Sequence, residues 1–97
     1  MSINRINTNE RMSQAVTHGD TIYVAGQVAL DAPNASVADQ TTDVLKRIDN
    51  LLAEAGSDKS KLLSATIWLA SMDDFNEMNG IWDAWIATGN APARACV

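Results

Sequence analysis

With 97 residues, the chain is long enough for one domain and too short for a second hydrophobic core. Its 46% hydrophobic and 20% charged residues are typical of a globular protein and exclude a disordered chain. A net charge of -5, with only 7 scattered Lys and Arg, argues against a nucleic-acid partner, which would require a basic surface.

The sequence also bears on where the protein works. A single cysteine excludes an internal disulfide, which argues against a small secreted domain. The N-terminus lacks the apolar core of a signal peptide, and no apolar run approaches the length of a membrane span. These features predict a cytoplasmic protein without a membrane partner.

The first part of the chain alternates apolar and polar residues, which predicts strands over about 3–6, 13–17 and 21–28. Gly19 lies between the second and third of these and can take a positive φ, so a tight turn and an antiparallel hairpin are expected. Gly26 falls inside the third predicted strand. A glycine there indicates a bulge or a close approach to the backbone.

The rest of the chain alternates between helical and strand patterns. Ser36 is placed to cap a helix whose apolar face runs to Ala55, and Gly56 ends it. A strand is expected over 62–70, followed by a second helix and a last strand after Pro92. The apolar face of the second helix comprises Phe75, Met78, Trp82, Trp85 and Ile86.

This order of elements predicts an α+β fold, with a single mixed sheet and both helices on one face. The other face of the sheet is then bare. Tyr23 or Trp68, or their alternates along the strand, would be exposed on it. Exposed apolar patches of this kind favour self-association.

Common catalytic and cofactor motifs are absent from the sequence. One histidine and one cysteine cannot provide a zinc site, so neither a metal nor a cofactor is expected. A Cys96–His18 nucleophile pair is disfavoured because His18 lies at a predicted hairpin turn. Cys96 is more simply explained as a small buried side chain.

Two other pairs have ordinary explanations. Asp73 and Asp74 are adjacent in sequence and lie where a helix begins, so the helix dipole explains them better than acid–base chemistry. Trp82 and Trp85 could form a stacking platform for a ligand. Their helical spacing favours a place in the core or in an interface.

Arg94 is the strongest candidate for binding a ligand. It lies on a predicted strand among small apolar residues, where a partly buried guanidinium requires a partner. A carboxylate is the best bidentate partner. That carboxylate could belong to this chain, to a neighbouring chain or to a ligand, and these alternatives are open at this point.

Five segments together resemble the Rid family (reactive intermediate deaminases, also called YjgF). Their order and spacing run through nearly the whole chain. They are residues 13–16 (SQAV), 22–28 (IYVAGQV), 51–56 (LLAEAG), 74–79 (DFNEMN) and 92–97 (PARACV).

The resemblance implies a chorismate-mutase-like fold in a homotrimer, with the sheets lining a central barrel and ligand clefts between subunits. It implies hydrolysis of 2-imino or 2-enamino acids to 2-keto acids and ammonia, without a cofactor or metal. Arg94 matches the family arginine that binds the substrate carboxylate. Asn79 matches a polar cleft residue, and the backbone beside Gly26 and Cys96 would lie close to the ligand.

The sequence departs from the family at two places. Residues 10–12 (ERM) replace the usual Gly-Pro-Tyr, so Met12 stands where a tyrosine covers the substrate. The family's water-activating glutamate lies on a strand beyond Val97, so the single domain of residues 1–97 is expected to lack its C-terminal strand. These departures motivate an alternative, a non-catalytic trimer that binds small carboxylates or has a regulatory role.

Overall fold

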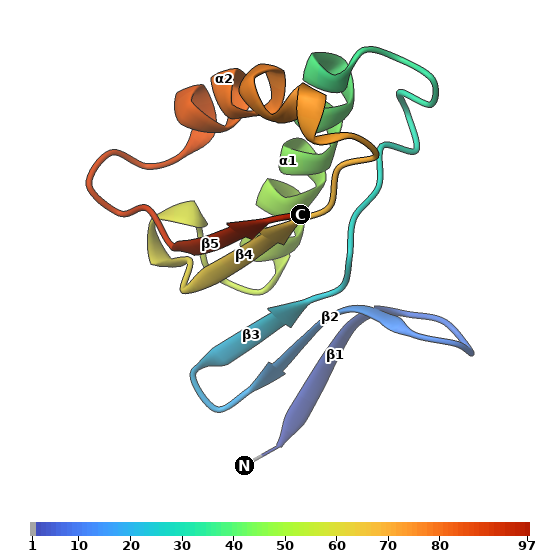
Figure 1. Ribbon diagram of the computed structural model, residues 1–97. Helices are drawn as coiled ribbons and strands as arrows, with labels where there is room; N and C mark the ends of the chain where they lie inside the picture. The colour runs from blue at the N-terminus through green and yellow to red at the C-terminus, as the bar shows by residue number, and fades with distance from the viewer. Residues whose placement is uncertain (1) are drawn as a thin grey trace.

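The computed structural model describes residues 2–97 and shows the predicted order of elements (Figure 1). The strands and helices are β1 (Ile3–Thr8), β2 (Ser13–His18), β3 (Thr21–Val24), α1 (Val37–Glu54), β4 (Ser64–Ile67), α2 (Phe75–Trp85) and β5 (Ala93–Cys96). Two short 3-10 helices, η1 (Lys59–Lys61) and η2 (Met72–Asp74), precede β4 and α2.

The first three strands form an antiparallel sheet in the order β1-β2-β3. The predicted turn between β2 and β3 is confirmed, because Gly19 adopts a φ of 60°. Ala15 at the centre of β2 pairs with Ile6 on one side and Val24 on the other, and it is only 1% exposed. The N-terminal third of the chain is therefore a three-stranded meander.

The last two strands, β4 and β5, pair in parallel and form a separate sheet. The prediction of a single mixed sheet is therefore wrong for the hydrogen-bonded pairing among residues 2–97, although the fold is α+β. The third strand is also shorter than predicted and ends at Val24 rather than near residue 28. Alternating hydrophobicity predicts strands and their faces, but it does not specify which strand edges pair.

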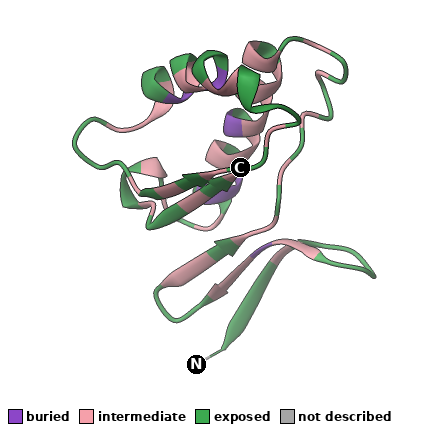
Figure 2. Ribbon diagram, viewed as in Figure 1, coloured by how far each residue is buried: buried purple, intermediate pink, exposed green. Residues whose placement is uncertain are grey.

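Both helices cover the same face of the β4–β5 pair. Leu45 from α1 and Met78 and Trp82 from α2 form a buried cluster at this interface. Half-buried side chains of the two strands pack against the cluster, and these are Ala65, Ile67 and Cys96. Figure 2 shows buried residues on both helices, and the prediction of two helices on one face holds for this pair of strands.

Helix α1 begins and ends as its sequence predicts. The Ser36 hydroxyl accepts a hydrogen bond from the Asp39 backbone N–H at 3.1 Å. The carboxylate of Glu77, from α2, accepts from the Ala38 N–H at 2.9 Å and satisfies a second free donor of the first turn. At the other end Gly56 takes a φ of 81°, as a glycine after a helix commonly does.

Replacing Ser36 with alanine is expected to lower the free energy of unfolding by about 1 kcal/mol, because the Asp39 N–H loses its acceptor. Chemical denaturation at a fixed protein concentration measures the change. Replacing the exposed Ser2, which precedes β1, with alanine is the control and should change nothing measurable. Equal stability of the two variants would show that the cap contributes nothing.

The opposite face of the strands is bare, as predicted. Trp68, directly after β4, is 74% exposed, and Tyr23 of β3 is 63% exposed. Large apolar side chains are thus exposed on the strands or directly next to them, at positions that the helices do not cover.

Candidate functional site

Arg94 lies on β5 and is half-buried on the side of the strand that faces the helices. Its neighbours Ala93 and Ala95 are exposed on the opposite side, as the alternation of a strand requires. The Nη1 group of Arg94 donates a hydrogen bond to Oδ1 of Asn79 on α2 at 2.7 Å. The structure therefore brings two of the predicted site residues into direct contact.

Two aromatic rings of α2 also contact the guanidinium. The Cζ atom of Arg94 lies 5.1 Å from the centroid of the Trp82 ring and 5.8 Å from that of Phe75. Both distances are within the range of cation–π attraction. The cation is thus held by rings and by one amide oxygen, none of which carries a negative charge.

No carboxylate of residues 2–97 lies within 4.0 Å of the Arg94 guanidinium. The ion pairs among these residues both involve Arg47, which binds Asp31 at 2.8 Å and Asp43 at 3.2 Å. A carboxylate of residues 2–97 is therefore excluded as the partner of Arg94 within one chain. The remaining alternatives are a ligand and a neighbouring chain.

Asn79 and Cys96 have distinct surroundings near Arg94. Because Oδ1 of Asn79 accepts from Arg94, the two N–H donors of its amide are directed away from the guanidinium. Cys96 is a free, half-buried thiol that packs against the helix core from the same strand as Arg94. Cys96 thus packs as a small, partly buried side chain, and its role toward a ligand stays a prediction.

The two other predicted site residues flank strands of the other sheet. Met12 directly precedes β2 and is 40% exposed, and Gly26 follows the end of β3. A Cβ added at Gly26 would meet no atom of the chain within 4 Å. Nothing among residues 2–97 would therefore crowd a side chain at Gly26, and no hydrogen bond or ion pair in this part of the chain joins Met12 or Gly26 to Arg94.

The aromatic contacts of Arg94 were not predicted from the sequence. Phe75 and Trp82 were expected in the core or in an interface, and Trp82 is indeed only 7% exposed. Their spacing contained a usable signal, since positions 75, 79 and 82 follow the i, i+4, i+7 pattern of one helix face. A residue that contacts Asn79 across that face must also lie near both rings.

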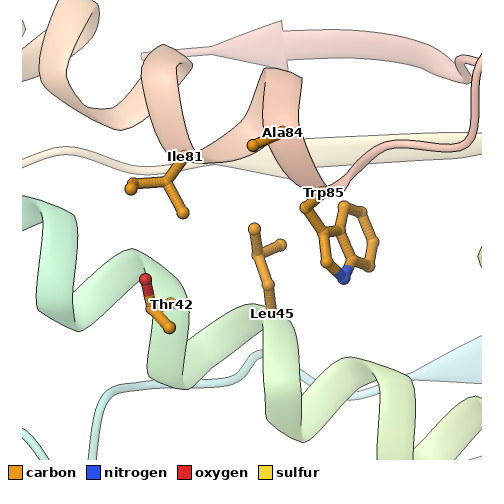
Figure 3. A pocket seen from close by; sticks show the side chains of 5 residues that line it. All are labelled: Thr42, Leu45, Ile81, Ala84 and Trp85. Carbon is orange, nitrogen blue, oxygen red and sulfur yellow. The ribbon is translucent and has the colours of Figure 1, made fainter.

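A cavity of about 270 Å³ lies elsewhere, between α1 and α2 (Figure 3). Leu45 and Trp85 point into it, with Thr42, Ile81 and Ala84 around them. None of the predicted site residues lines this cavity. Residues 2–97 contain neither a metal-binding cluster of His, Cys, Asp and Glu nor a helix that is long and apolar enough to cross a membrane.

Comparisons with known proteins agree with this architecture. The model of a family described as endoribonuclease L-PSP matches residues 2–97. The RutC family protein YoaB of Escherichia coli is 42% identical over 97 residues, which cover 100% of this chain and 83% of YoaB. A 2-iminobutanoate/2-iminopropanoate deaminase of Rattus norvegicus is 36% identical over 88 residues, covering 86% of this chain and 64% of that protein.

A solved structure is also closely similar. A member of the YjgF protein family from Neisseria meningitidis has a TM-score of 0.95 and 48% identity, and the match covers 100% of this chain and 80% of that one. The fold and the site together define a small α+β domain in which an arginine of the last strand contacts the second helix. The chain belongs to the Rid/YjgF family, which confirms the resemblance found in the sequence.

Proposed function

We propose that the protein hydrolyses 2-imino or 2-enamino acids to 2-keto acids and ammonia in the cytoplasm. The observation that carries this proposal is the half-buried Arg94 guanidinium, which has no carboxylate partner among residues 2–97. A substrate carboxylate would supply the missing anion. The mammalian relatives named as 2-iminobutanoate/2-iminopropanoate deaminases support this choice of substrate.

The proposed reaction requires little chemistry from the protein. Water adds to the electrophilic imine carbon and forms a C–O bond, and the resulting carbinolamine expels ammonia as the carbonyl forms. Arg94 fixes the carboxylate, while an Asn79 N–H can donate to a polar atom of the substrate. Positioning of this kind can supply much of a rate enhancement when the substrate is already electrophilic.

We further propose that the protein acts as a homotrimer, with the bare strand faces lining a central barrel and the ligand clefts between subunits. The exposed Trp68 and Tyr23 support this assembly, because burying them would remove apolar surface from water. Gly26 and Met12 would then reach the Arg94 of another subunit. This arrangement would explain why they are separated from Arg94 within one chain.

Replacing Trp68 with glutamate is expected to disrupt the trimer, because it places a charge in a buried apolar interface. Sedimentation velocity should give a mass of about three times 10.4 kDa for the unmodified protein and a smaller mass for the variant. The matched control is Lys46→Glu, on the exposed side of α1, which should leave the mass unchanged. A monomeric mass for the unmodified protein contradicts the assembly.

The activity is tested by generating 2-iminobutanoate in place with an amino-acid oxidase and following the release of 2-oxobutanoate. Acceleration over the uncatalysed hydrolysis supports the proposal. Saturable binding of 2-oxobutanoate without any acceleration supports the alternative, a non-catalytic trimer that binds small carboxylates or acts as a regulator. Met12, in place of the family's tyrosine, is the feature that motivates this alternative.

A further inference from the structure

We infer that Trp82 is a positioning residue for Arg94. Its indole face, together with the Phe75 ring, holds the guanidinium ready to receive a carboxylate. The inference takes the nature of the ligand from the proposed function. The contacts of Arg94 with Trp82, Phe75 and Asn79 lie within one chain.

The contacts come from one face of α2. Trp82 and Phe75 place their ring centroids 5.1 and 5.8 Å from Cζ of Arg94. Asn79, between them on the helix, accepts a hydrogen bond from Nη1 at 2.7 Å. Three side chains of a single rigid helix therefore fix both the position and the direction of the guanidinium.

Aromatic rings are better suited to this role than a protein carboxylate would be. A ring attracts the cation through its face and leaves the N–H donors in the guanidinium plane free. A protein carboxylate would occupy two of the five donors and compete with the ligand. Holding the long side chain beforehand also removes the entropic cost of ordering it when the ligand binds.

The Trp82 ring is buried in the helix core. It is 7% exposed and lies 5.4 Å from the Trp85 ring, at an interplanar angle of 52°. The indole N–H of Trp85 donates to Oδ2 of Asp49 on α1 at 2.9 Å. Trp85 thus has its own contact with α1, and Trp82 is the member of this pair whose ring lies against the Arg94 guanidinium.

Three variants test this role. Trp82→Phe keeps an aromatic face, Trp82→Leu keeps an apolar side chain without one, and Trp85→Leu removes the neighbouring ring, for which no contact with Arg94 is found. We expect Trp82→Leu to raise KM for 2-iminobutanoate about tenfold with kcat nearly unchanged, in line with the loss of a cation–π contact. Trp82→Phe and Trp85→Leu should stay within about threefold of the unmodified protein.

A spectroscopic measurement reports the contact without any ligand. In the unmodified protein and in Trp82→Phe, ring currents should shift the NMR signal of the Arg94 Nε–H group, and Trp82→Leu should reduce that shift. If Trp82→Leu fails to fold, Phe75→Leu removes the second ring and should raise KM severalfold.

Two results would overturn the inference. One is a Trp82→Leu variant with an unchanged KM and an unchanged Arg94 signal. The other is an equal rise in KM for Trp85→Leu, which would indicate a general loss of packing. If the unmodified protein hydrolyses no imine, the proposed function fails, while the NMR signal and the affinity for 2-oxobutanoate still decide the role of Trp82.

Discussion

Replacing Arg94 with alanine is expected to lower kcat/KM for 2-iminobutanoate hydrolysis at least a hundredfold. The variant loses the cation that donates to Asn79 and lies against the Phe75 and Trp82 rings, so a bound carboxylate would lose this counter-charge. Removing one partner of a buried, hydrogen-bonded charge pair costs about 2–5 kcal/mol, and the part of this range above about 2.7 kcal/mol corresponds to a factor of a hundred or more. Initial rates of 2-oxobutanoate release over a range of substrate concentrations measure it.

Two further variants separate charge from geometry. Arg94→Lys keeps the charge but loses the planar donors, and it should recover only a small part of the activity. Arg5→Ala removes an exposed arginine from β1, on the other sheet, and should leave kcat/KM unchanged. Full activity in Arg94→Ala would contradict the proposed site.

Replacing Met78 with alanine is expected to destabilise the protein by about 2–5 kcal/mol. Met78 is 1% exposed and lies with Leu45 and Trp82 at the centre of the helix core. The shorter side chain loses apolar burial and leaves a cavity that the rigid helices and strands cannot fill completely. Urea denaturation measures the loss, at one protein concentration because association affects apparent stability.

Met72 offers a matched control for this prediction. It is the same residue type, in η2 just before α2, but it is 52% exposed. Met72→Ala should change the free energy of unfolding by no more than about 0.5 kcal/mol. If the two variants were equally stable, the helix core would not be centred on Met78.

Local features of the fold could be predicted because each depends on a few neighbouring residues. Ser36 caps α1 and Gly56 ends it at positive φ, and both are visible as residue types before and after an apolar repeat. The turn at Gly19 was predicted in the same way, from a glycine between two strand patterns. The exposure of Trp68 also follows from the alternation along its strand.

Pairing between strands could not be predicted in the same way. The split between the β1–β3 sheet and the β4–β5 pair depends on contacts among residues far apart in sequence. Likewise, the strand pattern continues past Val24, although β3 ends there. Beyond β3, the side-chain amide of Gln27 donates a hydrogen bond to Oε1 of Gln14 on β2 at 2.9 Å.

The candidate site shows the same division. Arg94 was predicted as an isolated charge in an apolar strand, but its partners depend on how β5 packs beneath α2. Asn79, predicted only as a polar residue of the ligand cleft, lies at hydrogen-bond distance from Arg94, whereas the rings of Phe75 and Trp82 had been predicted in the core or in an interface. The roles of Met12 and Gly26 stay predictions, because they depend on a second subunit.

A crystal structure of the native protein with 2-oxobutanoate bound would show whether Arg94 binds the ligand carboxylate. We expect this carboxylate to lie in the plane of the Arg94 guanidinium, with N–O distances of about 2.7–2.9 Å. The rings of Trp82 and Phe75 should remain against the guanidinium. A ligand bound away from Arg94, or Arg94 paired with a carboxylate of a neighbouring subunit, would contradict this expectation.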